Sequence, residues 1–327
     1  MTRPTLIACV LCSSLATALY CALWSGSVFL QSLPVEAAAV AGASTESQSV
    51  ATAKLLPYPL AATVPPVIGA THYALLDATS GKLVVQQDAF REVPIASTTK
   101  LMTAHIVSQV GKLSDILTVS AQAAGQDGSL AHLVEGEKLR VTDTLHSLLL
   151  VSGNDAAHAL AEYAGGLLLR APGASPEEKT ARFVDEMNAE AVRLHMTQTH
   201  YVDPAGFMDE GHSSAADVAK IASVDLNDST IQPIMNTALY TAVDVRGWYR
   251  HDLRNSDRLI ADAPLEGTIG GKTGFTLGAG HCLVSAAKRG GHTLVAVILN
   301  TDLSDVDASA REARKLLEYG FSSVTWQ

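Results

Sequence analysis

Cysteine is scarce in this sequence, with four residues among 327. Cys9, Cys12 and Cys21 all lie close to the N-terminus, which leaves Cys282 as the one cysteine of the remaining chain. Cys282 has no second cysteine there to pair with, so a framework of internal disulfides is excluded. Its position in an apolar segment suggests a buried thiol, which makes a cysteine nucleophile a poor alternative.

The sequence also contains few positively charged residues and no recognisable metal-ligand pattern. Lysine and arginine number 23 against 33 acidic residues, for a net charge of −10, and no nucleic-acid partner is expected from so little positive charge. The eleven histidines form neither an H-x-x-x-H pattern nor a cluster with cysteine, so no zinc peptidase and no metal or organic cofactor is expected. A Ser-His-Asp triad through His212 lacks the G-x-S-x-G elbow that would support it.

The N-terminal segment predicts the compartment of the protein. No charged residue occurs from position 5 to 33, and the small-residue pattern at 34–39 is one that signal peptidases accept. We predict that residues 1–39 are a signal peptide or, because the apolar stretch is long, an uncleaved membrane anchor. Residues 40–66, rich in Ala, Ser, Thr and Pro, predict a flexible linker. The protein is therefore expected to be extracytoplasmic, secreted or anchored to the cell membrane, with membrane contact only through this segment.

Three short motifs stand out in the rest of the chain, which at 47% apolar residues overall can bury a large core. The first is Ser97-Thr98-Thr99-Lys100, which opens a stretch to Val110 with apolar residues at helical spacing. Lys100 therefore stands one helical turn behind Ser97 and could remove its proton. The helix dipole, Lys272 and partial desolvation would each disfavour the ammonium form of Lys100. Taken alone, a helix cap at Ser97 and a solvated Lys100 would be the better interpretation.

The second motif is Ser152-Gly153-Asn154. It follows the apolar run 145–151, typical of a buried helix, and precedes an alanine-rich segment. We predict a tight turn between two core helices, which can aim a hydroxyl and an amide into a cleft. The same residues also suit an ordinary turn with a helix cap, and both interpretations can hold together.

The third motif is Lys272-Thr273-Gly274, within the segment 268–276. Two apolar segments follow, 282–287 and 293–299, and they predict a hairpin with the motif segment as its antiparallel neighbour. A glycine at 274 lets a substrate backbone lie close along the strand edge. A phosphate-binding loop is excluded, because its first glycine would fall on Glu266 and no amphipathic helix follows.

The three motifs in this order resemble those of low-molecular-mass penicillin-binding proteins, the D-alanyl-D-alanine carboxypeptidase family of serine peptidases. The resemblance runs from about residue 67 to the C-terminus and makes 67–327 the expected catalytic domain. Further segments resemble the family in its order: Pro94–Thr103, Gly136-Glu137, Leu150–Ala157, Thr199–Tyr201 with Gly206, Gly211–Ala215 and Lys315–Phe321. The resemblance implies an α/β (α+β) fold of the β-lactamase/transpeptidase type. In that fold an antiparallel sheet flanked by helices meets a mostly helical subdomain, and the active site lies in the cleft between them.

The resemblance also implies catalytic roles for Ser97, Lys100 and Ser152. Ser97 would attack the carbonyl between the two terminal D-alanines of a peptidoglycan stem peptide, and Lys100 would take its proton. Ser152 would relay a proton to the leaving D-alanine, after which water hydrolyses the acyl-enzyme. β-Lactam antibiotics are the covalent inhibitors that the resemblance implies.

Substrate binding is implied for Asn154, Lys272, Thr273, Gly274 and Phe275. Asn154 would orient the catalytic lysine and the substrate amide, while Lys272 and Thr273 would receive the terminal carboxylate. The backbone amide of Phe275, together with that of the nucleophile, would hold the oxyanion.

One departure from the family concerns carboxylate recognition. Family members often carry an arginine a few residues before the final helix, where this chain has 305–311 with Arg311 as a nearby candidate. Cleavage of cross-links by a D,D-endopeptidase therefore stays open beside carboxypeptidase activity. A β-lactamase is a weaker alternative because no E-x-x-L-N segment lies between Asn154 and Lys272. A penicillin-binding sensor without turnover is the remaining alternative, although all three motifs are intact.

Overall fold

The computed structural model describes residues 55–60, 63–171 and 173–327. The predicted signal peptide or anchor at 1–39 lies outside the described residues, as does most of the predicted linker at 40–66. Within that linker, however, β1 (Pro57–Pro59) pairs antiparallel with β11 (Val324–Trp326). This segment therefore differs from a flexible tether, because its backbone is hydrogen-bonded to the last residues of the chain.

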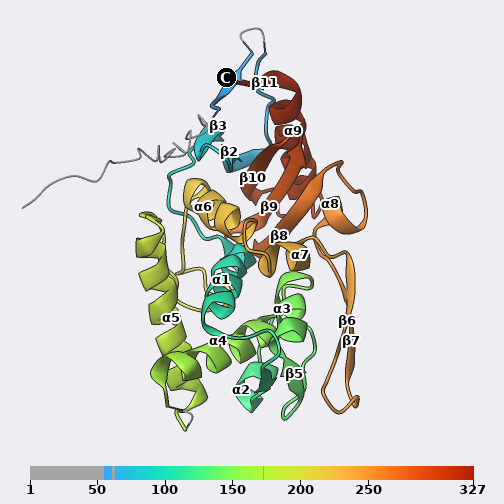
Figure 1. Ribbon diagram of the computed structural model, residues 1–327. Helices are drawn as coiled ribbons and strands as arrows, with labels where there is room; N and C mark the ends of the chain where they lie inside the picture. Colours follow the sequence, from blue (N-terminus) through green and yellow to red (C-terminus); the bar gives the residue numbers. More distant parts are fainter. Residues whose placement is uncertain (1–54, 61–62, 172) are drawn as a thin grey trace, which may run out of the picture. The chain divides into compact units, whose positions relative to one another are not determined.

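The main sheet is antiparallel and carries the third motif on an edge strand (Figure 1). Among the described residues it has five strands, in the spatial order β3 (Lys82–Gln87), β2 (Ala70–Asp77), β10 (His292–Thr301), β9 (Gly280–Arg289) and β8 (Thr268–Thr276). The β9–β10 hairpin and its neighbour β8 confirm the arrangement predicted for the segments after Lys272. Gly290 and Gly291 both have positive φ at the hairpin turn, a conformation that glycine adopts without strain.

Alternating residues of the central strands bury both faces of the sheet. In β10, Leu294, Ala296 and Ile298 belong to the same buried cluster as Leu316 and Leu317 of α9 (Ala308–Ser323). The intervening β10 residues join a larger cluster shared with the other helices. Figure 1 shows α9 on one side of the sheet and α6 (Ala215–Asp225) on the other. A period of two in the strand sequence thus produces a three-layer arrangement.

Helix α1 (Lys100–Val110) is the centre of the helical part (Figure 1). Its first eight residues are all buried, since it contacts helices on several sides. The other helices are α2 (Ala121–Ala124), α3 (Val141–Leu149), α4 (Asn154–Leu169), α5 (Pro176–Arg193), α7 (Ile231–Met235) and α8 (Arg258–Ala261). There are also two small ladders: β4 (Ile116–Thr118) with β5 (Lys138–Arg140), and β6 (Leu239–Val243) with β7 (Arg250–Arg254). The predicted combination of an antiparallel sheet and a mostly helical subdomain is confirmed.

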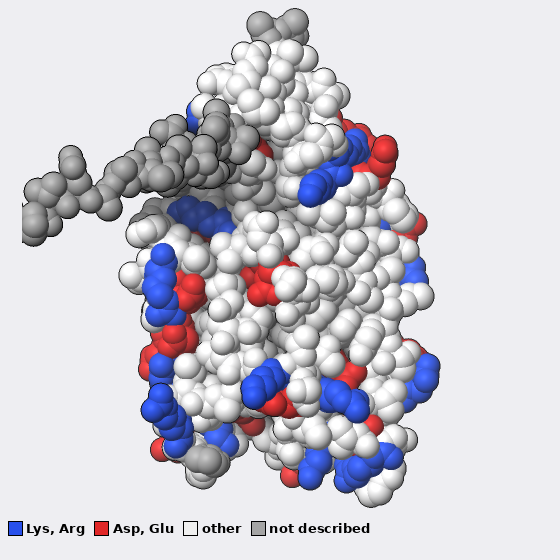
Figure 2. All heavy atoms as spheres, viewed as in Figure 1, with Lys and Arg blue, Asp and Glu red and all other residues white. Residues whose placement is uncertain are grey.

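The surface carries charges of both signs in close proximity. Figure 2 shows blue and red side chains next to one another along the margin where Figure 1 places α5. Arg182 and Arg193 both form ion pairs with Glu186 there. Within the described part of the chain, none of the helices combines the length and the apolar character that a bilayer crossing requires.

Candidate active site

Ser97 lies where the sheet meets the helical subdomain. It belongs to the short 3-10 helix η1 (Ala96–Thr99), which leads directly into α1 and contacts β8. Neither helix start has a side-chain cap bond, so the alternative in which Ser97 is chiefly an N-cap is not supported. Ala96 has a φ of 47°, a left-handed conformation that is unfavourable for alanine and fixes the direction of the chain into the serine.

The amine of Lys100 has three hydrogen-bond partners. Its Nζ lies 2.8 Å from Ser97 Oγ, 2.7 Å from Asn154 Oδ1 and 2.7 Å from the carbonyl oxygen of Ala205. The last two partners can only accept, and Asn154 is oriented by its own Nδ2 donating to the Asp127 carbonyl at 2.6 Å. A neutral amine has two N–H groups for these acceptors and one lone pair left for the serine proton. The geometry therefore suits a lysine that acts as a base.

Burial is the main reason why Lys100 can be neutral. The side chain is fully buried, and burial lowers its pKa to about 7, although Asp203 and Asp155 partly oppose the shift. Of the three causes that the sequence suggested, desolvation is the largest. The two lysines do interact: the pKa of Lys272 lies well below its usual value, first through burial and then through repulsion by Lys100.

Ser152 and Lys272 form a second linked pair. Lys272 Nζ donates to Ser152 Oγ at 2.9 Å and to the Thr273 carbonyl at 2.7 Å. Ser152 has a φ of 61°, so the turn between α3 and α4 holds its hydroxyl in a left-handed backbone conformation. Lys272 is only 1% exposed. Its amine is therefore enclosed and contacts the hydroxyl of Ser152, and its expected contact with a substrate carboxylate stays a prediction.

Two cavities adjoin Ser97, on either side of it along β8. One has a volume of about 280 Å³ and is lined mainly by hydroxyl-bearing residues and one arginine: Ser129, Ser152, Ser256, Arg258, Thr273 and Ser309. The other, of about 550 Å³, is more apolar and is lined by Phe207, Phe275 and Leu277 together with Gly128, Asn154 and Asp209. An extended chain along β8 would thus place its polar end on the hydroxyl side and its body on the apolar side.

Gly274 brings the edge strand against the start of η1. A Cβ atom at this position would lie 3.0 Å from the backbone nitrogen of Ser97 and 3.2 Å from both Ala96 Cβ and the Ile95 carbonyl oxygen. These separations are tighter than ordinary van der Waals contacts, so a glycine at 274 is needed for the close approach of β8 to η1. The same glycine would also let a substrate backbone lie close to β8. Phe275 follows; the residue is 47% exposed, and its ring is stacked on that of His281 at 4.4 Å between ring centres.

Several known proteins are similar to this chain in sequence and in structure. The profile of the D-alanyl-D-alanine carboxypeptidase family matches residues 60–303. A D-alanyl-D-alanine carboxypeptidase from Streptomyces sp. strain K15 is 32% identical over 80% of this chain and 90% of its own length. The solved structure of the Streptomyces K15 DD-transpeptidase covers 80% of this chain and 100% of that chain, with a TM-score of 0.72 and 30% identity. The chain belongs to the D-alanyl-D-alanine carboxypeptidase family.

Other relatives in the family are longer than the matched part. D-alanyl-D-alanine carboxypeptidase DacF of Bacillus subtilis is 32% identical over 76% of this chain, and the match covers 61% of that protein. Family membership confirms the fold class and the serine-peptidase class that the three motifs predicted.

Asp203 is a residue of the site that the motifs did not reveal. Its Oδ1 accepts from the backbone nitrogens of Ala205 and Gly206, both at 2.6 Å, and its Oδ2 accepts from Met208 at 2.9 Å. These bonds fix the loop whose Ala205 carbonyl contacts Lys100. Gly206 is required there, because a Cβ would lie 2.0 Å from the Ala96 carbonyl oxygen. The Asp-Pro-Ala-Gly sequence signals a turn, but nothing in it indicates that the turn meets the first motif.

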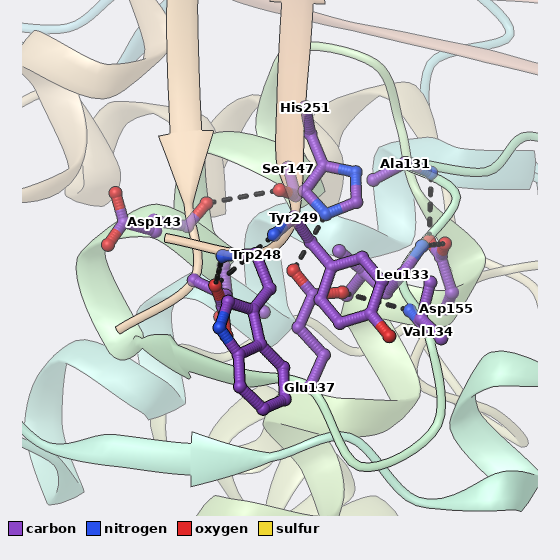
Figure 3. A network of polar contacts seen from close by, with 12 residues as sticks. Ala131, Leu133, Val134, Glu137, Asp143, Ser147, Asp155, Trp248, Tyr249 and His251 are labelled. Atoms are coloured by element: carbon purple, nitrogen blue, oxygen red, sulfur yellow. Dashed lines mark hydrogen bonds and ion pairs between the residues drawn. The ribbon is translucent and has the colours of Figure 1, made fainter. Parts of the chain in front are cut away.

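Asp155 likewise fixes a loop beside the site. Figure 3 shows its carboxylate between the backbone nitrogens of Ala131 and Leu133, at 3.0 and 2.9 Å. The same loop is held by Glu137, which is fully buried and accepts from Val134 N while its other oxygen lies 2.7 Å from His251 Nε2. Asp155 follows Asn154 directly, so the first turn of α4 supplies the amide that contacts Lys100 and also holds the loop that carries Ser129, a residue of the cavity wall.

Two further residues that the sequence singled out, Arg311 and Cys282, are not suited to a role in the reaction, although Cys282 lines the hydroxyl-lined cavity. Arg311 pairs with Asp305 at 2.7 Å and is absent from the residues that line the two cavities described above. The Cys282 thiol is buried, and burial raises its pKa to about 12, so it is not a nucleophile near neutral pH. The arginine that does reach the hydroxyl-lined cavity is Arg258, at the first position of α8.

Proposed function

We propose that this protein is a serine-type D-alanyl-D-alanine carboxypeptidase that removes the terminal D-alanine of peptidoglycan stem peptides through an acyl-enzyme on Ser97. The observation that carries the proposal is the contact set of Lys100. Two acceptors take its N–H groups, and its third contact is Ser97 Oγ at 2.8 Å. A buried lysine with a pKa of about 7 in this geometry is suited to activate a serine.

In the acylation step, Ser97 Oγ forms a bond to the carbonyl carbon of the penultimate D-alanine while its proton passes to Lys100 Nζ. The developing oxyanion would be held by the backbone amides of Ser97 and Phe275. When the C–N bond breaks, the leaving nitrogen would take a proton from Ser152, which contacts Lys272. Ser152 would recover a proton from the Lys100 ammonium, so that Lys100 is neutral again before deacylation. D-alanine leaves with a neutral or protonated amine, and the ester on Ser97 remains.

In the deacylation step, a water molecule attacks the ester and Lys100 again takes a proton. The products are the shortened stem peptide with a free carboxylate and the regenerated serine. β-Lactams would acylate Ser97 in the same way by opening of their ring, with the leaving nitrogen still tethered to the acyl group.

Cleavage or formation of cross-links remains the second candidate. The solved structures with about 30% identity are named for DD-transpeptidase activity, in which an amine replaces the water. The apolar cavity of about 550 Å³ beside Ser97 is where an acyl chain would lie in either reaction. Hydrolysis and transfer are separated by adding an amino-acid acceptor to the assay and measuring both products.

The test is release of D-alanine from a synthetic pentapeptide that ends in D-Ala-D-Ala. The full-length protein should release one D-alanine from each peptide over many turnovers. Ser97→Ala should reduce the rate of D-alanine release to background. A single turnover followed by arrest would indicate a penicillin-binding sensor. Rapid repeated hydrolysis of penicillin without peptide cleavage would move the function to a β-lactamase.

We also propose that the enzyme acts outside the cytoplasm, where its peptidoglycan substrate is found. The support is the sequence of residues 1–39, with its uncharged apolar stretch and small-residue pattern. Alkaline phosphatase or β-lactamase fused after residue 66 would report export in cells, and a fusion lacking residues 1–39 would serve as the control.

A further inference from the structure

The terminal carboxylate of the proposed substrate needs a cation that it can reach. Lys272 is 1% exposed, and its Nζ already contacts Ser152 and the Thr273 carbonyl. Arg311, which the sequence suggested, pairs with Asp305 and Glu312 away from the cavity. The segment 305–311 contributes only Val306 and Ser309 to the cavity wall, and neither is charged.

Arg258 is the arginine among the described residues that line this cavity. Its side chain is 46% exposed, so the guanidinium is accessible to a ligand. We infer that Arg258 binds the C-terminal carboxylate of the substrate, together with the hydroxyls of Thr273 and Ser256. This inference rests on the proposed function and assigns the carboxylate contact to α8, an element to which no motif of the sequence pointed.

The backbone around Arg258 is held firmly against the edge strand. Asp257 is fully buried, caps α8 by accepting from Leu259 N at 2.9 Å, and lies so close to β8 that a Cβ on Gly271 would be 2.0 Å from its Oδ2. Two residues before Arg258, Ser256 Oγ lies 2.5 Å from Thr273 Oγ1. The hydroxyl pair and the guanidinium therefore border the same cavity as Ser97 from a common rigid support.

Asp307 orients the guanidinium. Arg258 Nε lies 2.7 Å from Asp307 Oδ1, at the residue just before α9. An arginine has five N–H donors, so an ion pair on the Nε side leaves the terminal nitrogens for a bidentate contact with a carboxylate. The Asp307 side chain is about half exposed. Its negative charge also weakens the binding of anions that do not contact Arg258 directly.

The experiment compares two peptides that differ only at the C-terminus. One pentapeptide ends in D-Ala-D-Ala with a free carboxylate, and the other ends in the corresponding carboxamide. Wild-type enzyme should prefer the free acid, and Arg258→Gln should lower kcat/KM for the acid by about 10- to 100-fold, the usual range for a lost charged hydrogen bond. The same variant should change kcat/KM for the amide by no more than about twofold, so that the preference disappears. Arg258→Lys should restore part of it, since a point charge replaces a bidentate fork.

Two further variants distinguish the effect of losing the Arg258 charge from the effect of changing nearby charged residues. Arg311→Gln removes an arginine outside the cavity and should retain the preference for the free acid. Asp307→Asn removes the ion-pair partner that orients Arg258, so it should reduce the preference without abolishing it. An unchanged preference in Arg258→Gln, or its loss in Arg311→Gln, would overturn the inference while leaving the proposed function intact. If wild-type enzyme releases D-alanine or D-alaninamide from neither peptide, the proposed function itself has failed.

Discussion

At the scale of single residues, reactivity here depends on removing charged groups from water. Lys100 and Lys272 are among the largest fully buried side chains, and each has its pKa lowered chiefly by burial. Asp257, also fully buried, partly opposes the shift of Lys272 and has its own pKa raised to about 7. Desolvation of this kind costs stability, and it is retained where a base must be neutral near physiological pH.

The pH dependence of acylation follows from the pKa of Lys100. Only the neutral amine can accept the serine proton, so the acylation rate should be low below pH 7, rise through half of its maximum near pH 7 and level off above it. Stopped-flow labelling with a fluorescent penicillin on both sides of neutrality measures this curve. Asp203→Asn removes a negative charge that holds the pKa of Lys100 up, so its curve should shift to lower pH. A rate that falls as pH rises through neutrality would contradict the role of Lys100.

Substitution of the base itself gives a second residue-scale prediction. Lys100→Arg should abolish acylation, because a guanidinium stays protonated and cannot accept the serine proton. The exposed Lys112, just past the other end of the same helix, provides the matched control, and Lys112→Arg should acylate at the wild-type rate. Labelling of Lys100→Arg at more than a few per cent of the wild-type rate would exclude Lys100 as the base.

At the scale of elements, the site depends on the close approach of η1 and β8. Gly274→Ala should force the strand away from the Ser97 nitrogen, since the added Cβ would meet it at 3.0 Å. We expect acylation to slow by at least about tenfold through loss of oxyanion binding. Gly166→Ala is the control: its Cβ would meet only Lys179 side-chain atoms at ordinary distance, and alanine in α4 should raise stability by up to about 1 kcal/mol. Wild-type acylation by Gly274→Ala would show that the spacing is not critical.

The sequence predicted the elements that carry the motifs better than the contacts between them. Helical periodicity after Lys100, the turn at Ser152 and the hairpin after Lys272 are local signals, and the structure has all three. Asp203, Arg258 and the β1–β11 pairing depend on which distant segments meet. No local pattern encodes that Ala205 reaches a lysine 105 residues before it in the chain. Desolvation was one of three causes that the sequence suggested for a lowered Lys100 pKa, but local patterns could not rank it first, because burial is a property of the packed molecule.

At the scale of the whole molecule, the nucleophile lies at the junction of two differently built parts. The sheet supplies β8 as an edge against which a peptide can lie extended, and the helical subdomain supplies Lys100, Ser152 and Asn154 from α1 and the α3–α4 turn. The two cavities that share Ser97 lie where these parts meet. Both substrate positioning and proton transfer therefore depend on contacts made across the junction, among them the approach of Gly274 to Ser97 and the Ser152–Lys272 bond.

The central claim is that Ser97 carries the acyl group, and mass spectrometry of the intact protein tests it most directly. After mixing with excess benzylpenicillin, the protein should gain the mass of one ligand per chain and keep it for minutes, since no E-x-x-L-N glutamate is present to activate a deacylating water. Peptide mapping should place the added mass on Ser97, and Ser97→Ala should gain none while its Tm stays close to that of the wild type. Modification of another residue, or undiminished labelling of Ser97→Ala, would contradict the account.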